Sequence, residues 1–244
     1  MNRRGFLIAA GGFTLSPRLL IAQDQNAQIR MARVAAVERA MAARRSQSKP
    51  IPAEWIVGQL GEGMTDRDRR IMGFELVRNI PYRLTTWKGD PDSLFALGRG
   101  DCRHKSAALL RLMRVWKFEA RAVQVLFDWA DLPIPSSIIR VLGETRGVHD
   151  TVEVDIDGAM KLVDPTWSLE FRAAGFPVQM AWDGRRPTLS VTLKANAIVR
   201  PGDLKQGENI YAHFKLEWPR RENVLAFNRA FNAWSDELST RAKS

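Results

Sequence analysis

Residues 98–110 read Gly98-Arg99-Gly100-Asp101-Cys102-Arg103-His104-Lys105-Ser106-Ala107-Ala108-Leu109-Leu110 and contain the only cysteine of the 244-residue chain. Two glycines lead into Cys102, and apolar residues at helical spacing follow it. One stripe of that pattern holds Ala107, Leu110, Met113 and Trp116, with Leu109 and Leu112 beside it. The pattern predicts a helix that begins at or next to Cys102.

Two properties of a helix N-terminus suit a nucleophilic cysteine. The partial positive charge of its unpaired N–H groups favours thiolate over thiol. The same N–H groups can hydrogen-bond an oxyanion that forms beside the sulfur. A lone cysteine is also often a small buried apolar residue, so both readings of Cys102 stay open at this point.

Residues 149–166 form the second informative stretch. Apolar and polar residues alternate up to Ile156, the dipeptide Asp157-Gly158 follows, and residues 159–163 resume an extended pattern. Asp-Gly between two such segments is a strong signal for a two-residue β-hairpin turn. With these two residues in the turn, Ile156 faces Ala159.

This register divides the hairpin side chains between two faces. His149, Thr151, Asp164 and Thr166 share one face, and the Cα atoms of His149 and Asp164 are diagonal neighbours roughly 7–8 Å apart. The opposite face is expected in the core and holds Val152, Val154, Ile156 and Val163. A slip of one residue would separate His149 from Asp164. The alternative is an exposed His149 and an Asp164 that only begins the Asp-Pro turn.

The remaining pattern predicts further elements around these two stretches. Helices are expected over residues 25–45, with Ile29, Val34, Val37 and Met41 inward, from the N-cap Thr65 to Pro81, over 94–97, and over 224–238. Strands are expected over residues 119–127, 189–193 and 211–218, a turn at Asp183-Gly184, and a polar linker over 46–52. The mixture indicates an α+β fold.

A thiol, an imidazole and a carboxylate are together the parts of a thiol-dependent acyl-transfer site. His149 would accept the proton of the Cys102 thiol and later protonate a leaving amine. Asp164 would hold the ring in the required tautomer and stabilise the imidazolium. Such a site attacks amides.

Several motifs resemble the bacterial transglutaminase-like superfamily. They are Gly98-Arg99-Gly100-Asp101-Cys102, Ala107-Ala108-Leu109-Leu110, Glu119-Ala120-Arg121-Ala122-Val123, His149 with Val152-Glu153-Val154, and Leu162-Val163-Asp164-Pro165-Thr166. The resemblance implies a papain-like α+β core whose nucleophile helix packs on an antiparallel sheet, with added N- and C-terminal helices. It carries the catalytic roles onto Cys102, His149 and Asp164. The chain departs from the family pattern at Asp150 and Thr151, which bears on substrate preference.

Other residues near these motifs have less defined roles. An upstream side chain often completes the oxyanion hole of papain-like sites, and the resemblance suggests Tyr82, with Trp87 behind it. Packing is the alternative for both. His104 lies two residues past Cys102 on the helix and is expected to point away, at the surface or behind the nucleophile. No partner for His213 can be identified.

The N-terminal segment resembles a twin-arginine export signal, with Asn2-Arg3-Arg4-Gly5-Phe6-Leu7 followed by a short apolar stretch. That stretch is shorter than the roughly 20 residues that span a bilayer, and an uncleaved anchor is the alternative. The expected organisation is an export signal over 1–22, an N-terminal helix and linker over 23–50, and a catalytic domain over 51–244. In the oxidising periplasm a single cysteine cannot form an intrachain disulfide, which favours a functional thiol or an intermolecular bridge.

Composition limits the remaining function classes. With 45% hydrophobic and 26% charged residues, the chain is typical of a soluble globular protein. Its net charge of +10 is spread along the chain without the aromatic-interleaved basic tract of single-stranded nucleic-acid binders, so no nucleic-acid partner is expected. The histidines and the cysteine lack metal-ligand spacing, so neither a metal nor a cofactor is expected. The acidic residues Glu153 and Asp155 leave a glycosidase as an unspecific rival.

We therefore expect an exported, periplasmic cysteine peptidase or amidase that hydrolyses peptide or isopeptide bonds of cell-envelope substrates through a thioester, with at most peripheral membrane contact. Two alternatives stay open. One is a protein-glutamine acyltransferase that transfers the same thioester to an amine and crosslinks proteins. The other is a non-catalytic envelope binding protein that retains the fold.

Overall fold

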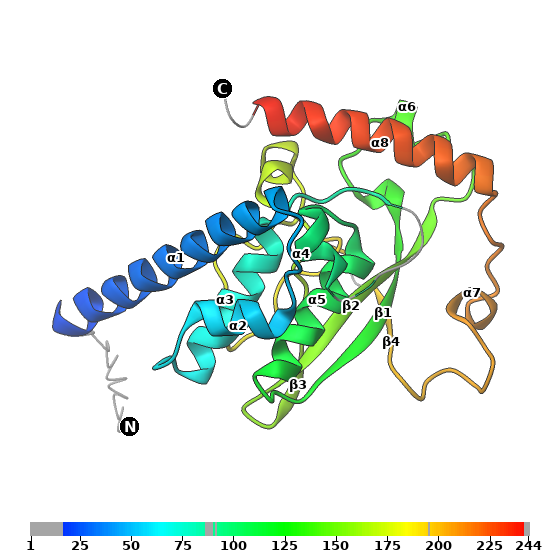
Figure 1. Cartoon of the computed structure of the whole chain (residues 1–244). Coiled ribbons are helices and arrows are strands. Elements are labelled where there is room, and N and C mark those ends of the chain that lie inside the picture. Colours follow the sequence, from blue (N-terminus) through cyan, green and yellow to red (C-terminus); the bar gives the residue numbers. More distant parts are fainter. Residues whose placement is uncertain (1–16, 86–89, 91, 195, 242–244) are drawn as a thin grey trace, which may run out of the picture.

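The computed structural model describes residues 17–85, 90, 92–194 and 196–241. The helices are α1 (Pro17–Ser46), α2 (Ala53–Leu60), α3 (Asp66–Asn79), α4 (Ser93–Leu97), α5 (Cys102–Val115), α6 (Ser136–Ile139), α7 (Ile210–His213) and α8 (Arg221–Arg241). The strands are β1 (Ala120–Asp128), β2 (Arg146–Ile156), β3 (Ala159–Val163) and β4 (Ala197–Val199), with 3-10 turns η1 (Trp129–Asp131) and η2 (Leu169–Ala174). Figure 1 shows their arrangement, a mixed α+β architecture.

The four strands form one antiparallel sheet in the order β3-β2-β1-β4. The expected β-hairpin is confirmed, because Ile156 pairs with Ala159. Asp157 and Gly158 have φ angles of 59° and 80°, the left-handed conformation that a primed two-residue turn requires at both positions. Val152 pairs with Val163 farther along the same ladder. The turn therefore sets the register of the whole hairpin.

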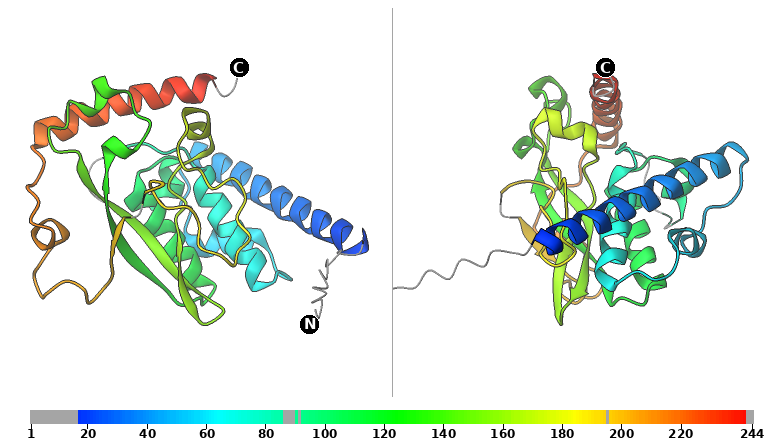
Figure 2. Two further views of the ribbon diagram at one scale, coloured as in Figure 1. Left: turned by 180° about the vertical axis from the view of Figure 1, so that it is seen from behind. Right: turned by 90° about the vertical axis from the view of Figure 1, so that its left-hand side faces the viewer.

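One face of the sheet packs against the layer formed by α1–α5, which Figure 2 shows on a single side of the strands. The predicted inward set of the hairpin, Val152, Val154, Ile156 and Val163, is fully buried in this core. Helix α5 contributes Ala108, Leu109, Leu112 and Met113 to the same core. The stripe predicted on α5 is therefore rotated, since Ala107 and Leu110 are only half-buried. The difference arises because α5 packs against α2, α3 and the sheet at once.

The opposite face of the sheet carries an aromatic core closed by the C-terminal helix. Val125 and Phe127 of β1 pack there with Trp167, Phe171, Phe176, Phe227 and Phe231. The predicted amphipathic C-terminal helix is confirmed as α8, with Phe227 and Phe231 buried. Figures 1 and 2 show α8 lying across one end of the sheet.

The helical layer agrees in most places with the expected pattern. Thr65 caps α3 through a capping box with Asp68, and α3 ends just before Pro81. Helix α4 ends at Gly98, whose φ of 65° is in the left-handed region. Helix α1 starts at Pro17, earlier than expected, and buries Val34, Val37 and Met41. Ile29 was expected inward but is half exposed, because this part of α1 extends beyond the globular body.

Two expected strands are absent from the described segments. Residues 189–193 are not a strand, and Leu189 and Leu193 face solvent, because residues 197–199 take the place beside β1. Residues 211–218 fold back on themselves instead: Asn209 caps the short α7, and the ring of Tyr211 stacks on Trp218 at 4.1 Å. The turn at Asp183 is confirmed, since its carboxylate accepts bonds from the N–H groups of residues 185 and 186.

The expected export signal falls largely on residues 1–16, which lie outside the described residues. Among the described helices, none has the length and hydropathy needed to cross a bilayer.

Candidate active site

Cys102 is the first residue of α5, and the chain reaches it through a tight turn. Gly100 is required there, because a Cβ at this position would lie 2.7 Å from Cβ of His104 and 2.9 Å from a methyl group of Leu94. Asp101 is the N-cap, and its carboxylate accepts hydrogen bonds from the backbone N–H groups of Arg103 and His104. The glycine and the cap together place the Cys102 thiol at the start of the helix.

His149 and Asp164 form a buried pair on the hairpin. Nε2 of His149 lies 2.8 Å from Oδ2 of Asp164, and the two side chains are each 2% exposed. The other carboxylate oxygen of Asp164 accepts the backbone N–H of Thr166, and the Thr188 hydroxyl accepts the backbone N–H of Asp164. Asp164 is therefore fixed at both its side chain and its backbone.

The thiol belongs to the same group of side chains. Burial alone would lower the pKa of His149, but the charge and hydrogen bond of Asp164 raise it, and a hydrogen bond with Cys102 and the thiolate charge raise it further, to about 10. Because Nε2 faces Asp164, Nδ1 is the ring nitrogen left for the sulfur. An imidazole that is held by a carboxylate on one side and has a thiol nearby is the arrangement from which a thiolate–imidazolium pair can form.

Cys102 and His149 line a cavity of about 460 Å³. Its apolar lining includes Phe127, Trp129, Leu142, Val224 and Phe227, and its charged lining includes Arg103, Glu144, Arg146, Asp150 and Glu208. Residues 204–219 and the first turns of α8 supply one wall. A cavity of this size, apolar with a few polar groups, is typical of a small-ligand or peptide side-chain site.

Gly147 explains how an aromatic wall fits beside His149. A Cβ at Gly147 would lie 2.8 Å from Nε1 of Trp129 and 3.2 Å from the ring of Phe127. The rings of Phe127 and His149 are 6.1 Å apart in an edge-on arrangement. The absence of a side chain at Gly147 thus lets the rings of Trp129 and Phe127 pack against β2 beside His149.

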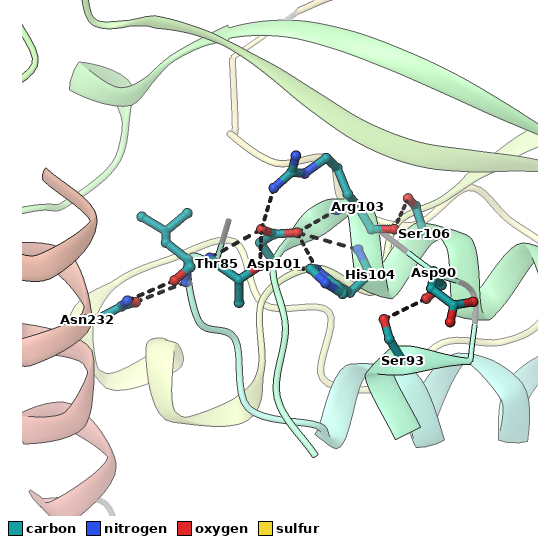
Figure 3. Close-up of polar contacts among 9 residues, drawn as sticks. Thr85, Asp90, Ser93, Asp101, Arg103, His104, Ser106 and Asn232 are labelled. Carbon is teal, nitrogen blue, oxygen red and sulfur yellow. Dashed lines mark hydrogen bonds and ion pairs between the residues drawn. The ribbon is translucent and has the colours of Figure 1, made fainter. Parts of the chain in front are cut away.

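Behind the nucleophile, Asp101 collects several donors, which Figure 3 shows around its carboxylate. The Thr85 hydroxyl donates to Oδ2 at 2.8 Å, and Nη2 of Arg103 lies 3.0 Å from the same oxygen. Nδ1 of His104 lies 2.7 Å from Oδ1. Burial alone would raise the pKa of the Asp101 carboxyl, but the bonds from His104 and Arg103 hold it well below its usual range. The start of α5 is therefore anchored by an ionised carboxylate.

The other two histidines are placed away from the thiol chemistry. His104 was expected either at the surface or behind the nucleophile. It is only 2% exposed and lies behind the nucleophile, so the surface position is wrong. The reason is the buried Asp101 carboxylate that its ring contacts. His213 is exposed, and its Nδ1 lies 3.4 Å from Oε2 of Glu208.

Tyr82 has features of both roles considered for it. Its ring packs 4.8 Å from Trp167 and also contacts Phe171 and Phe231. It lines the cavity beside Cys102 as well. Burial, and then the Cys102 charge, raise the pKa of the Tyr82 phenol well above its usual value, so the phenol stays a neutral donor. Trp87 lies outside the described residues.

The rival acidic pair is engaged elsewhere. The Glu153 carboxylate is bound from both sides by Arg121 and Arg200, at 2.6 Å and 2.9 Å. These ion pairs hold the Glu153 carboxylate in its ionised form and occupy it, so it is not available as a catalytic acid. Neither Glu153 nor Asp155 lines the cavity. No group of three or more potential metal ligands occurs among the described residues.

Sequence reasoning missed two parts of this region. Lys105 is completely buried behind the nucleophile, and its place three residues after Cys102 on the apolar side of the helix was the available signal. The aromatic wall from Trp129 and α8 was also missed, because strand and helix periodicity do not report which distant elements meet.

No protein-family model and no curated protein matches the sequence. Among solved structures, the chain is similar to one described as the crystal structure of a TGase, with 12% identity and a TM-score of 0.34. The likeness covers 66% of this chain and 36% of that one, so this chain spans about a third of the neighbour's length. At this TM-score the likeness carries no functional weight, and an assignment has to come from the side chains of the site.

Proposed function

We propose that this protein is a transglutaminase-like cysteine peptidase or amidase that hydrolyses peptide or isopeptide bonds. The observation that carries the proposal is the buried His149 imidazole, which lies 2.8 Å from Asp164 and lines the same 460 Å³ cavity as the Cys102 thiol at the start of α5. A buried histidine with a purely structural role does not require a free thiol beside it at the start of a helix. This combination is the arrangement that activates a sulfur nucleophile.

The proposed reaction has two steps. The Cys102 thiolate attacks the amide carbon, the C–N bond breaks, and the His149 imidazolium gives its proton to the leaving amine. Water then attacks the thioester while His149 accepts a proton, and the C–S bond breaks to release the acid and regenerate the thiolate–imidazolium pair. Asp164 stabilises the imidazolium in both steps.

The oxyanion would be stabilised at the start of α5. The Asp101 carboxylate already occupies the N–H groups of Arg103 and His104, so the Cys102 N–H is the donor of the first turn that the cap leaves available. The Tyr82 phenol, which lines the same cavity, is the proposed second donor. Two donors converging on one oxygen are the usual composition of such a hole.

We further propose that the substrate is a peptide or protein of the cell envelope and that export follows the twin-arginine-like N-terminus. The support is the motif Arg3-Arg4 with its apolar extension and the net charge of residues 23–244, which is +7 once Arg3, Arg4 and Arg18 are subtracted from +10 and suits anionic envelope polymers. Fusing residues 1–40 to a reporter that is active only after export tests this part. Replacing Arg3 and Arg4 by lysine should abolish export.

The test of the activity compares wild type with Cys102→Ala on isolated envelope material and on a glutamine-containing peptide, scoring new amines and released ammonia. Wild type should release them and Cys102→Ala should not. Ammonia released only when a second amine is added would indicate the crosslinking acyltransferase instead. His149→Gln should be inactive as well, and His213→Gln is its matched control, because His213 is exposed and is not among the residues that line the cavity. Equal inactivity of wild type and Cys102→Ala, with an ordinary thiol alkylation rate, would leave the binding-protein alternative.

A further inference from the structure

Lys105 is a fully buried lysine that the proposed reaction does not use. It lies three residues after Cys102 on α5, so the two side chains leave the helix on neighbouring positions. The side chain is 0% exposed. Its Nζ donates to the carbonyl oxygen of Arg78 at 3.0 Å and to that of Pro165 at 3.4 Å.

The two carbonyl partners belong to segments that hold the site. Pro165 directly follows Asp164, whose carboxylate orients His149. Arg78 lies in the last turn of α3, just before the chain passes Pro81 to Tyr82. One ammonium group therefore joins the nucleophile helix to the turn after β3 and to the segment that leads to Tyr82.

The charges around Lys105 do not form a compensating ion pair. Burial lowers the pKa of Lys105 most, to about 7, while Glu170 and Asp164 raise it and Arg78 lowers it. Within the described part of the chain, its Nζ hydrogen-bonds two carbonyl oxygens and no carboxylate. Burying an ammonium without a direct counter-ion costs stability, and the two hydrogen bonds to carbonyl oxygens offset this cost only in part. What the lysine adds over an apolar side chain of similar length is therefore the connection between the two segments.

We propose that Lys105 is a positioning residue that holds the Asp164 turn against the nucleophile helix and so sets the distance between the Cys102 sulfur and the His149 ring. This inference rests on the proposed function of that site. Lys105 is not among the residues that line the cavity, and it acts through the carbonyl oxygens of residues 78 and 165.

The variant Lys105→Met separates positioning from folding. It keeps the length and volume of the side chain but removes both hydrogen bonds. The unfolding temperature should stay near that of wild type, because relief of the buried charge and loss of the donor to the carbonyl oxygens of residues 78 and 165 act in opposite directions. The rate of Cys102 alkylation by iodoacetamide near pH 6, and kcat for peptide hydrolysis, should both fall by roughly 10- to 100-fold, since misplacing a reacting group by about 1 Å costs about that much. KM should change less than kcat, because most of the cavity lining comes from β1, β2, residues 204–219 and α8, which Lys105 does not hydrogen-bond.

Arg114→Met is the matched control, because Arg114 is an exposed cation on the same helix. It should leave the alkylation rate and kcat unchanged. Lys105→Gln is the second variant: it keeps an uncharged NH₂ donor on a shorter side chain, and its alkylation rate and kcat should fall between those of wild type and Lys105→Met.

The outcomes distinguish this inference from the activity on which it rests. If Lys105→Met alkylates at the wild-type rate across about pH 6 to about pH 9, the positioning role is wrong, whatever the protein hydrolyses. The role is also wrong if activity falls only in proportion to the folded fraction in both Lys105 variants. If neither wild type nor Cys102→Ala hydrolyses the substrate, the proposed peptidase activity is wrong. The alkylation rates of the Lys105 variants would still test the positioning role.

Discussion

Nε2 of His149 lies 2.8 Å from Oδ2 of Asp164 although the two residues do not face each other in the ladder. The ladder ends with the pairing of Val152 and Val163, and the same register extended by one residue sets Thr151 opposite position 164, which leaves His149 one diagonal step away. The Thr166 N–H donates to the second carboxylate oxygen, at 3.1 Å, and so turns the carboxylate toward the ring. A diagonal contact of this kind exists in one register only.

Replacing Asp164 by asparagine tests the orienting role of the carboxylate. The amide keeps the shape but removes the charge that stabilises the imidazolium, so kcat should fall on the order of 10³-fold with the fold intact. Asp157→Asn, at the exposed turn of the same hairpin, is the control and should change nothing. An Asp164→Asn enzyme with wild-type kcat would remove Asp164 from the mechanism.

The raised pKa of His149 predicts a particular dependence of stability on pH. Because the folded pKa of about 10 lies above the ordinary 6.5, the imidazolium contributes stability that is complete below pH 6.5 and is lost as pH rises through about 10. His149→Gln should lower the free energy of unfolding by roughly 3 kcal/mol below pH 6.5. The deficit should shrink toward pH 10, measured by urea denaturation at several pH values. A deficit that grows with pH would mean that His149 is neutral when folded.

Asp101 should matter more than an ordinary helix cap. Asp101→Ala removes the cap and leaves the buried His104 ring and the Thr85 hydroxyl without their acceptor, so we expect a loss of roughly 3 kcal/mol or more. Thr65→Ala at the cap of α3 should cost only about 1 kcal/mol. Because the folded pKa of Asp101 is depressed below 3.8, its contribution is complete above that pH and lost below it. Equal losses in the two cap variants at neutral pH would contradict the anchoring role.

Tyr82→Phe distinguishes an oxyanion donor from a core aromatic. If the phenol stabilises the oxyanion, kcat should fall by roughly 100-fold with KM and the unfolding temperature unchanged. If the ring only packs against Trp167, Phe171 and Phe231, kcat should not change. Tyr82→Ala should destabilise the protein by about 3–5 kcal/mol in either case.

Gly147→Ala should change the shape of the cavity by displacing Trp129. The new methyl group would lie 2.8 Å from Nε1 of Trp129, so the indole has to move into the cavity. We expect a loss of about 1–3 kcal/mol in stability and a raised KM with a smaller effect on kcat. Gly58→Ala is a control of opposite sign, since that helical glycine has open space around it and alanine should stabilise α2 by up to about 1 kcal/mol. An unchanged KM in Gly147→Ala would show that substrate does not contact Trp129.

Local signals predicted the parts of the fold that local chemistry controls. The Asp157-Gly158 turn, the Thr65 N-cap and Gly98 at the end of α4 each specify backbone conformation over a few residues, and all three are observed. From the turn alone the two faces of the hairpin follow, and with them the contact between His149 and Asp164. The catalytic roles of these residues remain predictions.

Long-range packing is what the patterns could not supply. The alternation over residues 189–193 is that of a strand, but residues 197–199 pair with β1 and leave Leu193 exposed. Lysine is usually a surface residue, but Lys105 is buried because α3 and the turn after β3 pack against it. The cavity wall from α8 depends equally on contacts between distant elements.

The two-residue turn at Asp157 and Gly158 lies far from the sulfur, yet it governs which insertions the protein can tolerate. One contiguous hairpin carries both the imidazole and its carboxylate, and adding a single residue to either strand between them would turn one of the two toward the helices. Lengthening that hairpin by balanced pairs of residues keeps the partners together, so parity, rather than length, is the rule for engineering it.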